Sequence, residues 1–123
     1  MRQIASVSAA VLCGLILGAG HKVDTSDMEL MYTTAYYCGE ITANGSKVHH
    51  GGAACNPHLG DVAIVYNLEG EYLGTYEIND TGSSEGLQNG DVIDVYRKNL
   101  TMCNSWMKLT GGRVYVQWVH GNG

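Results

Sequence analysis

The sequence predicts a small, mainly β domain: a closed or nearly closed sheet with one short helix. Three observations predict it. Five short segments are rich in β-branched or aromatic residues, glycine-containing turn signals separate them, and one stretch follows a helical period. The length of 123 residues fits one domain with one core, and 17 glycines against 1 proline suit tight turns.

The five expected strands are short and enriched in residues that favour a pleated sheet. They cover residues 30–38, 61–66, 71–78, 92–96 and 113–119. The turn signals between them are Asn44-Gly45, Gly51-Gly52, Glu69-Gly70, Asn89-Gly90 and Gly111-Gly112.

One stretch, about residues 98–109, breaks the strand period. Leu100, Cys103 and Met107 recur at spacings of three and four, which places them on one face of a helix. A Thr-Gly-Gly sequence directly after the stretch ends it. We expect Met107 and the neighbouring Trp106 to pack against the core.

The N-terminus has the layout of a secretory signal peptide over residues 1–20. Met1-Arg2 is followed by an uncharged apolar run and then by small residues, which predicts cleavage after Ala19 or Gly20. An uncleaved membrane anchor is the alternative. Residues 21–29 then form a short tether, and residues 30–120 form the domain of a secreted protein.

The net charge limits which molecules this protein can bind. Seven basic against 12 acidic residues give a net charge of -5, which argues against nucleic-acid binding and, after signal removal, against stable membrane contact.

Cleavage of the signal peptide would leave three cysteines, Cys38, Cys55 and Cys103. Export favours one disulfide plus one free thiol, but the sequence does not say which two cysteines pair.

Asp94 interrupts an otherwise apolar strand. By alternation Ile93 and Val95 share one face, while Asp94 shares the other with Val92 and Tyr96. In a low-dielectric cleft the pKa of this carboxyl would rise, which suits a general acid. A solvated or hydrogen-bonded strand aspartate is the alternative.

Asp80 opens the sequence Asp-Thr-Gly-Ser-Ser at residues 80–84. An aspartate in this context suits a turn, and it also suits a carboxylate presented close to Asp94. The five letters match the active-site signature of pepsin-like aspartic proteases as well. That chemistry needs two such aspartates and hence a dimer.

The sequence Cys-Asn-Pro-His at residues 55–58 has the spacing of a zinc-ligand pair. A zinc site would need two more ligands, for instance Cys38 and Cys103, and no second close pair exists. We therefore expect the histidines to lie in surface loops, with no metal and no cofactor.

Five motifs occur in order between about residues 31 and 119. They are Thr34-Ala35-Tyr36-Tyr37 with Ile41-Thr42-Ala43-Asn44-Gly45, Leu59-Gly60 before Val62-Ala63-Ile64-Val65-Tyr66, Asp80-Thr81-Gly82, Val92-Ile93-Asp94-Val95-Tyr96, and Gly112-Arg113-Val114-Tyr115-Val116. Together they resemble the bacterial 3D domain, a family named for three aspartates.

The resemblance implies a six-stranded double-psi β-barrel with one short helix, related to the barrel of membrane-bound lytic transglycosylase A. It implies cleavage of peptidoglycan between N-acetylmuramic acid and N-acetylglucosamine, leaving a 1,6-anhydro end. Asp94 would be the acid and base, and Asp80 would position or tune it. The substrate-binding residues expected around them are Thr42, Thr81, Gly82, Asn56 and Tyr96. We expect a monomeric, bacterial or phage-encoded protein at the cell wall.

One departure from the family keeps other functions open. The first family aspartate falls at Asn56, which cannot ionise. A barrel that binds cell-wall glycans without cutting them is therefore the main alternative, with the dimeric aspartic protease as the third.

Overall fold

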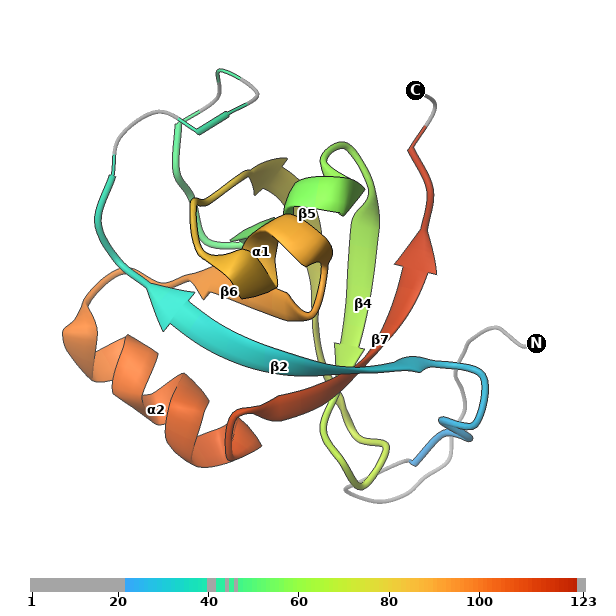
Figure 1. Ribbon diagram of the computed structural model, residues 1–123. Coiled ribbons are helices and arrows are strands. Elements are labelled where there is room, and N and C mark those ends of the chain that lie inside the picture. Colours follow the sequence, from blue (N-terminus) through green and yellow to red (C-terminus); the bar gives the residue numbers. More distant parts are fainter. Residues whose placement is uncertain (1–21, 40–41, 44, 46, 122–123) are drawn as a thin grey trace.

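The structure, a computed structural model, describes residues 22–39, 42, 43, 45 and 47–121 (Figure 1). The predicted signal peptide lies outside these residues. The elements are strands β2 (Glu29–Tyr36), β3 (Gly52–Ala54), β4 (Val62–Tyr66), β5 (Tyr72–Asp80), β6 (Val92–Tyr96) and β7 (Arg113–Val119), helices α1 (Glu85–Asn89) and α2 (Leu100–Thr110), and the 3-10 turn η2 (Asn56–His58). No helix of this described part is long and apolar enough to cross a membrane.

The six strands form a closed barrel, which confirms the predicted mainly β fold. Their order around the barrel is β2-β6-β3-β5-β4-β7. Strand β2 runs parallel to β6, β3 runs parallel to β5, and the other four pairings are antiparallel. The barrel is therefore a mixed sheet in which strands distant in sequence become neighbours.

All five predicted strands are present; two have the predicted ends, and the ends of the others differ by at most two residues. Strand β3 was not predicted, because its first residue belongs to a Gly-Gly pair interpreted as a turn. Gly51, at φ +99°, makes that turn, and Gly52 begins the strand. A Cβ on Gly52 would lie 2.8 Å from Nδ2 of Asn79, so only glycine leaves room for that buried amide.

The predicted helix is α2, which lies against β2 at the lower left of Figure 1. The side chain of Asn99 caps its first turn by accepting from the Met102 N–H at 2.9 Å. Gly111 ends it at φ 65°, a left-handed conformation that glycine adopts without strain. The one-turn helix α1 is a second, shorter helix that the sequence pattern did not indicate.

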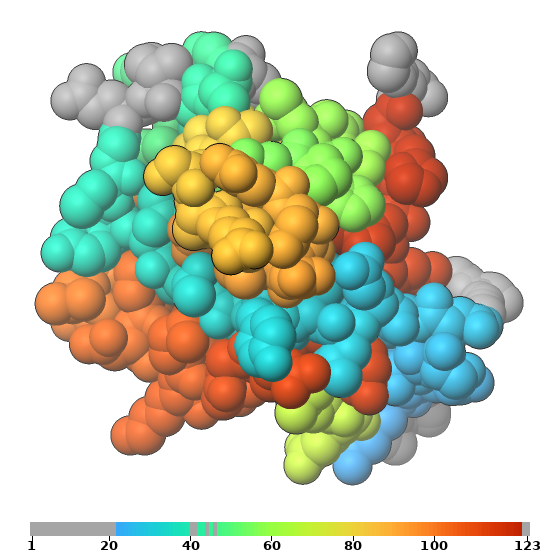
Figure 2. Space-filling model, viewed as in Figure 1, coloured from blue at the N-terminus to red at the C-terminus, as the bar shows by residue number. Residues whose placement is uncertain are grey.

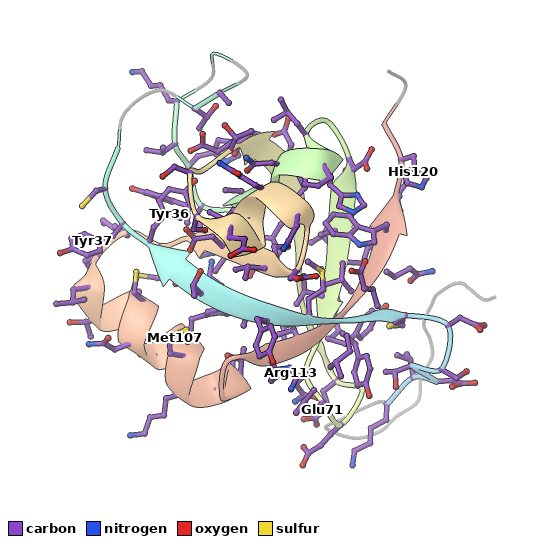
Figure 3. The ribbon with its side chains drawn as sticks, in the orientation of Figure 1. Tyr36, Tyr37, Glu71, Met107, Arg113 and His120 are labelled. Carbon is purple, nitrogen blue, oxygen red and sulfur yellow. The ribbon has the colours of Figure 1, made fainter. Side chains whose placement is uncertain are left out.

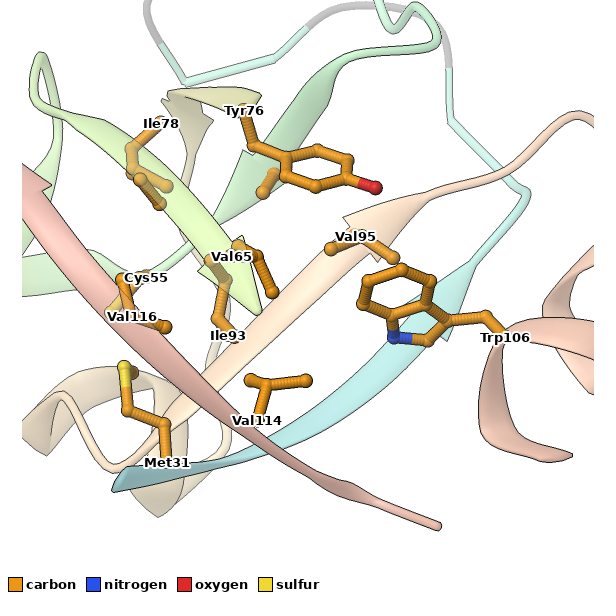
Figure 4. Packing of buried hydrophobic residues seen from close by; sticks show 12 residues of the cluster. Met31, Cys55, Val65, Tyr76, Ile78, Ile93, Val95, Trp106, Val114 and Val116 are labelled. Carbon is orange, nitrogen blue, oxygen red and sulfur yellow. The ribbon is translucent and has the colours of Figure 1, made fainter. Parts of the chain in front are cut away.

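The barrel interior is filled mainly by alternate residues of the strands, and all three residues of the short strand β3 are buried (Figure 4). On β6, Ile93 and Val95 are fully buried while Asp94 and Tyr96 are only partly buried, so the predicted alternation is confirmed. The central buried cluster consists of Met31, Ala53, Cys55, Ala63, Val65, Tyr76, Ile78, Ile93, Val95, Trp106, Val114 and Val116.

Helix α2 contributes Trp106 to this cluster, as predicted (Figure 4). The indole N–H donates to Oγ1 of the buried Thr33 at 2.9 Å. The guanidinium carbon of Arg97 lies 4.6 Å from the Trp106 ring centroid, and Arg97 also donates to the Tyr76 hydroxyl at 2.6 Å. Every polar group at this contact between helix and barrel thus has a partner, which lets aromatic rings fill it. Met107, in contrast, is 36% exposed and lies on the helix surface.

The cysteines do not form the expected disulfide. Cys38, Cys55 and Cys103, the cysteines of the described chain, are free thiols in the structure. Cys38 is exposed and the other two are buried.

Candidate active site

The unpredicted strand β3 brings the two candidate carboxylates together. Ala54, its last residue, pairs with Asp80 of β5 on one side and with Asp94 of β6 on the other. The two aspartates therefore flank one small residue, although 14 positions separate them in sequence. Both side chains are partly buried, which is the placement the catalytic hypothesis requires.

Asp94 is held by its neighbour on β2. Thr34, its direct partner in the register, donates from Oγ1 to Oδ1 of Asp94 at 2.8 Å. Within the described chain Oδ2 of Asp94 has no hydrogen-bond partner. Burial raises the pKa of Asp94, the Thr34 hydrogen bond lowers it, and the charge of Asp80 raises it further, with a net upward shift. A carboxyl with a raised pKa and a free oxygen can hold and deliver a proton.

Asp80 has a different environment, because three donors converge on it. Its Oδ1 accepts from the backbone N–H groups of Ala43 at 3.0 Å and Thr81 at 2.9 Å. Its Oδ2 accepts from the Tyr36 hydroxyl at 3.3 Å. Two neighbouring carboxyls with such unequal hydrogen bonding are suited to different roles.

Tyr36, labelled in Figure 3, lies at the C-terminal end of β2 and donates from its hydroxyl to Asp80. Its pKa is raised, first by burial and then by the charges of Asp80 and Asp94, so the phenol keeps its proton and donates it to Asp80. The ring meets Tyr96 edge-on, with centroids 5.6 Å apart. No role in the site was predicted for Thr34 or Tyr36. Their alternation on one strand could be seen in the sequence, but the sequence does not show that this strand lies beside β6.

Asn56 fixes the turn that carries Asp80. Its Nδ2 donates to the Gly82 carbonyl at 2.8 Å, and its Oδ1 accepts from the Gly82 N–H at 2.9 Å. The Asn56 amide thus forms a reciprocal pair with the backbone of Gly82. A carboxylate could accept the second of these bonds but could not donate the first.

Gly82 also packs closely against Leu87 of α1. A Cβ at this position would overlap Cδ1 of Leu87, the buried residue of α1. The helix itself is capped by Ser84, whose Oγ accepts from the Leu87 N–H at 3.4 Å. Figure 2 shows the yellow-orange segment around α1 at the middle of this face, above the cyan β2. Helix α1 therefore closes tightly onto the turn that follows Asp80.

The other predicted substrate-binding residues lie in and around this site. Thr81 is exposed next to Asp80, and Tyr96 is partly buried on the same face of β6 as Asp94. Thr42 is 5% exposed, beside the Ala43 N–H that binds Asp80. The structure thus brings all seven predicted site residues to one region of the barrel surface.

The Cys-x-x-His pair has no geometry for zinc. Cys55 is completely buried in the core, and burial, followed by the charges of Glu29 and Asp61, raises the pKa of its thiol to about 12. A zinc ligand must instead lose its proton readily. Its partner in the motif, His58, lies on the surface side of η2 with other neighbours, described below.

No family model matches this chain, and neither a curated protein nor a solved structure matches it. The closed six-stranded mixed barrel is compatible with a double-psi barrel. The resemblance to the 3D domain stays a prediction, so a functional assignment depends on the geometry of Asp80 and Asp94.

Proposed function

We propose that the protein is a secreted, cell-wall-associated lytic transglycosylase that cuts peptidoglycan glycan strands with Asp94 as acid and base. One observation carries the proposal. Asp94 is a partly buried carboxyl with a raised pKa and one unpartnered oxygen, on the outer face of a barrel strand beside a second, fully hydrogen-bonded carboxyl. The closed mixed barrel is the architecture expected for a double-psi barrel of the 3D family.

The reaction needs only one well-placed carboxyl. Protonated Asp94 donates its proton to the glycosidic oxygen as the bond to C1 of the N-acetylmuramic acid unit breaks, and that sugar gains oxocarbenium character. The resulting carboxylate then takes the proton of the same sugar's 6-hydroxyl as O6 bonds to C1. Asp94 ends protonated again, and the product carries a 1,6-anhydro ring. No water is consumed.

In this proposal Asp80 is a positioning residue. Its charge contributes to the raised pKa of Asp94, and its bond to Tyr36 fixes the phenol beside the reacting carboxyl. Exposed aromatic residues nearby, such as Tyr37, offer faces on which sugar rings can stack (Figure 3).

The strand arrangement gives the two carboxyls separate environments. Asp80 and Asp94 are separated by β3, so their backbones lie about two strand spacings, about 10 Å, apart. Their unequal hydrogen bonding suits two carboxyls with separate tasks. The dimeric aspartic protease would instead pair Asp80 with Asp80 of a second copy of this chain.

The decisive experiment is digestion of purified sacculi followed by mass spectrometry of the soluble products. We expect anhydro-muropeptides from the unaltered protein and none from Asp94→Asn. The matched control is Asp91→Asn, which changes an exposed aspartate just before the same strand and should leave product release intact. Product release by Asp94→Asn would refute the assignment.

A glycan-binding barrel without activity is the competing function. It predicts that the protein pellets with sacculi while no soluble product appears. The use of Asn56 as a backbone clamp in place of a third acid is the observation that favours it.

A further inference from the structure

Two histidines and one aspartate converge at the end of β7, away from the two candidate catalytic carboxyls. Nδ1 of His58 lies 2.9 Å from Oδ2 of Asp61, and Nδ1 of His120 lies 3.2 Å from the same oxygen. One possible ligand atom from each of the three residues lies within 4.8 Å of the other two. His120 is labelled in Figure 3, beyond the arrowhead of β7.

We propose that His58, Asp61 and His120 form a binding site for a divalent transition metal ion, with Zn²⁺ as the ion that fits best. Imidazole nitrogen with carboxylate oxygen is a donor set that zinc uses in proteins. Metal–ligand distances of about 2.05 Å in a tetrahedron place ligand atoms about 3.3 Å apart. The two separations from Oδ2, 2.9 and 3.2 Å, are close to that spacing, and the ligand atoms of the two histidines lie within 4.8 Å of each other.

Two of the three ligands are already oriented. The Asp61 carboxylate is fixed by its other oxygen, because Oδ1 accepts from the Gly121 N–H at 2.9 Å. The His58 ring stacks on Trp118 with centroids 3.6 Å apart and planes only 3° from parallel. Such outer contacts reduce the reorganisation that binding would otherwise require.

The proton balance of binding is simple. Without the ion, each Nδ1 facing the carboxylate carries a hydrogen and donates it. When the ion binds Nδ1 of His58 and of His120, the single hydrogen of each neutral ring is carried by Nε2 instead. Three protein ligands leave one tetrahedral position for water, and the 78% exposure of the His120 side chain gives the ion a path from solvent.

The site is also connected to the turn that carries Asp80. His58 ends η2, whose first residue, Asn56, clamps Gly82. An ion held by His58 would therefore stiffen η2 at one end while Asn56 acts at the other. The proposal does not depend on glycan cleavage, since it concerns binding alone.

The test is calorimetric titration of the full chain with Zn²⁺, alongside NMR of the histidine rings. We expect one saturable site per chain and shifted ring resonances for His58 and His120. His120→Ala should weaken Zn²⁺ binding at least 10-fold. Substitution of a residue that only contacts a metal ligand already weakens metal binding by about 10-fold, and His120 would be a ligand itself. His50→Ala, an exposed histidine outside the cluster, is the matched control and should bind like the unaltered protein.

Asp61→Asn provides a second variant, because its amide oxygen can still accept from Gly121 while the negative charge is lost. Zn²⁺ binding should weaken in this variant with the circular dichroism spectrum unchanged. Absence of saturable binding to the unaltered protein, or equal affinity in His120→Ala, would overturn the proposal and leave a purely structural clamp.

Discussion

The reciprocal pair between Asn56 and Gly82 makes a sharp prediction for Asn56→Asp, the change that introduces the acid that the resemblance to the 3D domain implies at this position. At pH 7 the new carboxylate oxygen would face the Gly82 carbonyl at the position where Nδ2 now donates over 2.8 Å. The carbonyl loses its partner, which costs about 1–3 kcal/mol. The hydrogen bond from the Gly82 N–H now has a charged acceptor, which stabilises the folded state by about 1 kcal/mol.

We therefore expect Asn56→Asp to lower the free energy of unfolding by up to about 2 kcal/mol at pH 7. In urea, with a slope of about 2 kcal/mol/M, the midpoint should fall by up to about 1 M. Asn104→Asp makes the same chemical change at an exposed position of α2 and should stay within about 0.5 kcal/mol of the unaltered protein.

The penalty should also depend on pH in a defined direction. The carbonyl oxygen disfavours the charged form, so the introduced carboxyl has a higher pKa in the folded than in the unfolded protein, where it is about 3.9. The folded state then binds more protons, and stability falls as the pH rises through this window. A gain of stability in Asn56→Asp at pH 7, or a stability difference that does not change between pH 3 and pH 7, would refute this reasoning.

Three further outcomes follow from buried contacts. Burial raises the pKa of Asp94 in the folded state, so this group's contribution to stability is lost as the pH rises above about 4. Urea unfolding across pH should show Asp94→Asn gaining stability relative to the unaltered protein over that range. Gly82→Ala should cost about 1–3 kcal/mol through overlap with Leu87, and a double-mutant cycle with Leu87→Ala should recover part of that loss. Trp106→Ala should cost about 3–5 kcal/mol, whereas Trp106→Phe, which loses only the bond to Thr33 and some packing, should cost less in thermal unfolding.

Long, periodic segments were predictable from the sequence because their own side chains define them. The alternation around Asp94 describes the observed faces of β6. The helical spacing located α2 but not its buried face, which consists of Cys103, Trp106 and Thr110, while Leu100 and Met107 are exposed. Strand β3 was not predictable in this way, because Gly-Ala-Ala has no side chains that favour a sheet. Its conformation is imposed by the strands on either side.

The candidate site was predictable as a set of residues but not as an arrangement. Asp80 and Asp94 were identified from motifs, yet their proximity depends on Ala54 pairing with both. The roles of Thr34 and Tyr36 likewise depend on β2 lying beside β6. The histidine cluster joins positions 58, 61 and 120, and no spacing pattern indicates so distant a contact.

The place of β7 in the barrel has a consequence for folding. It is the last strand in chain order, yet it lies between β4 and β2, pairing Ile64 with Gln117 and Met31 with Val114. Until it is in place, both neighbours have open edges and the barrel cannot close. Pairings over such long sequence separations make folding slow. The chain therefore acquires its closed barrel only when nearly all its described residues are available.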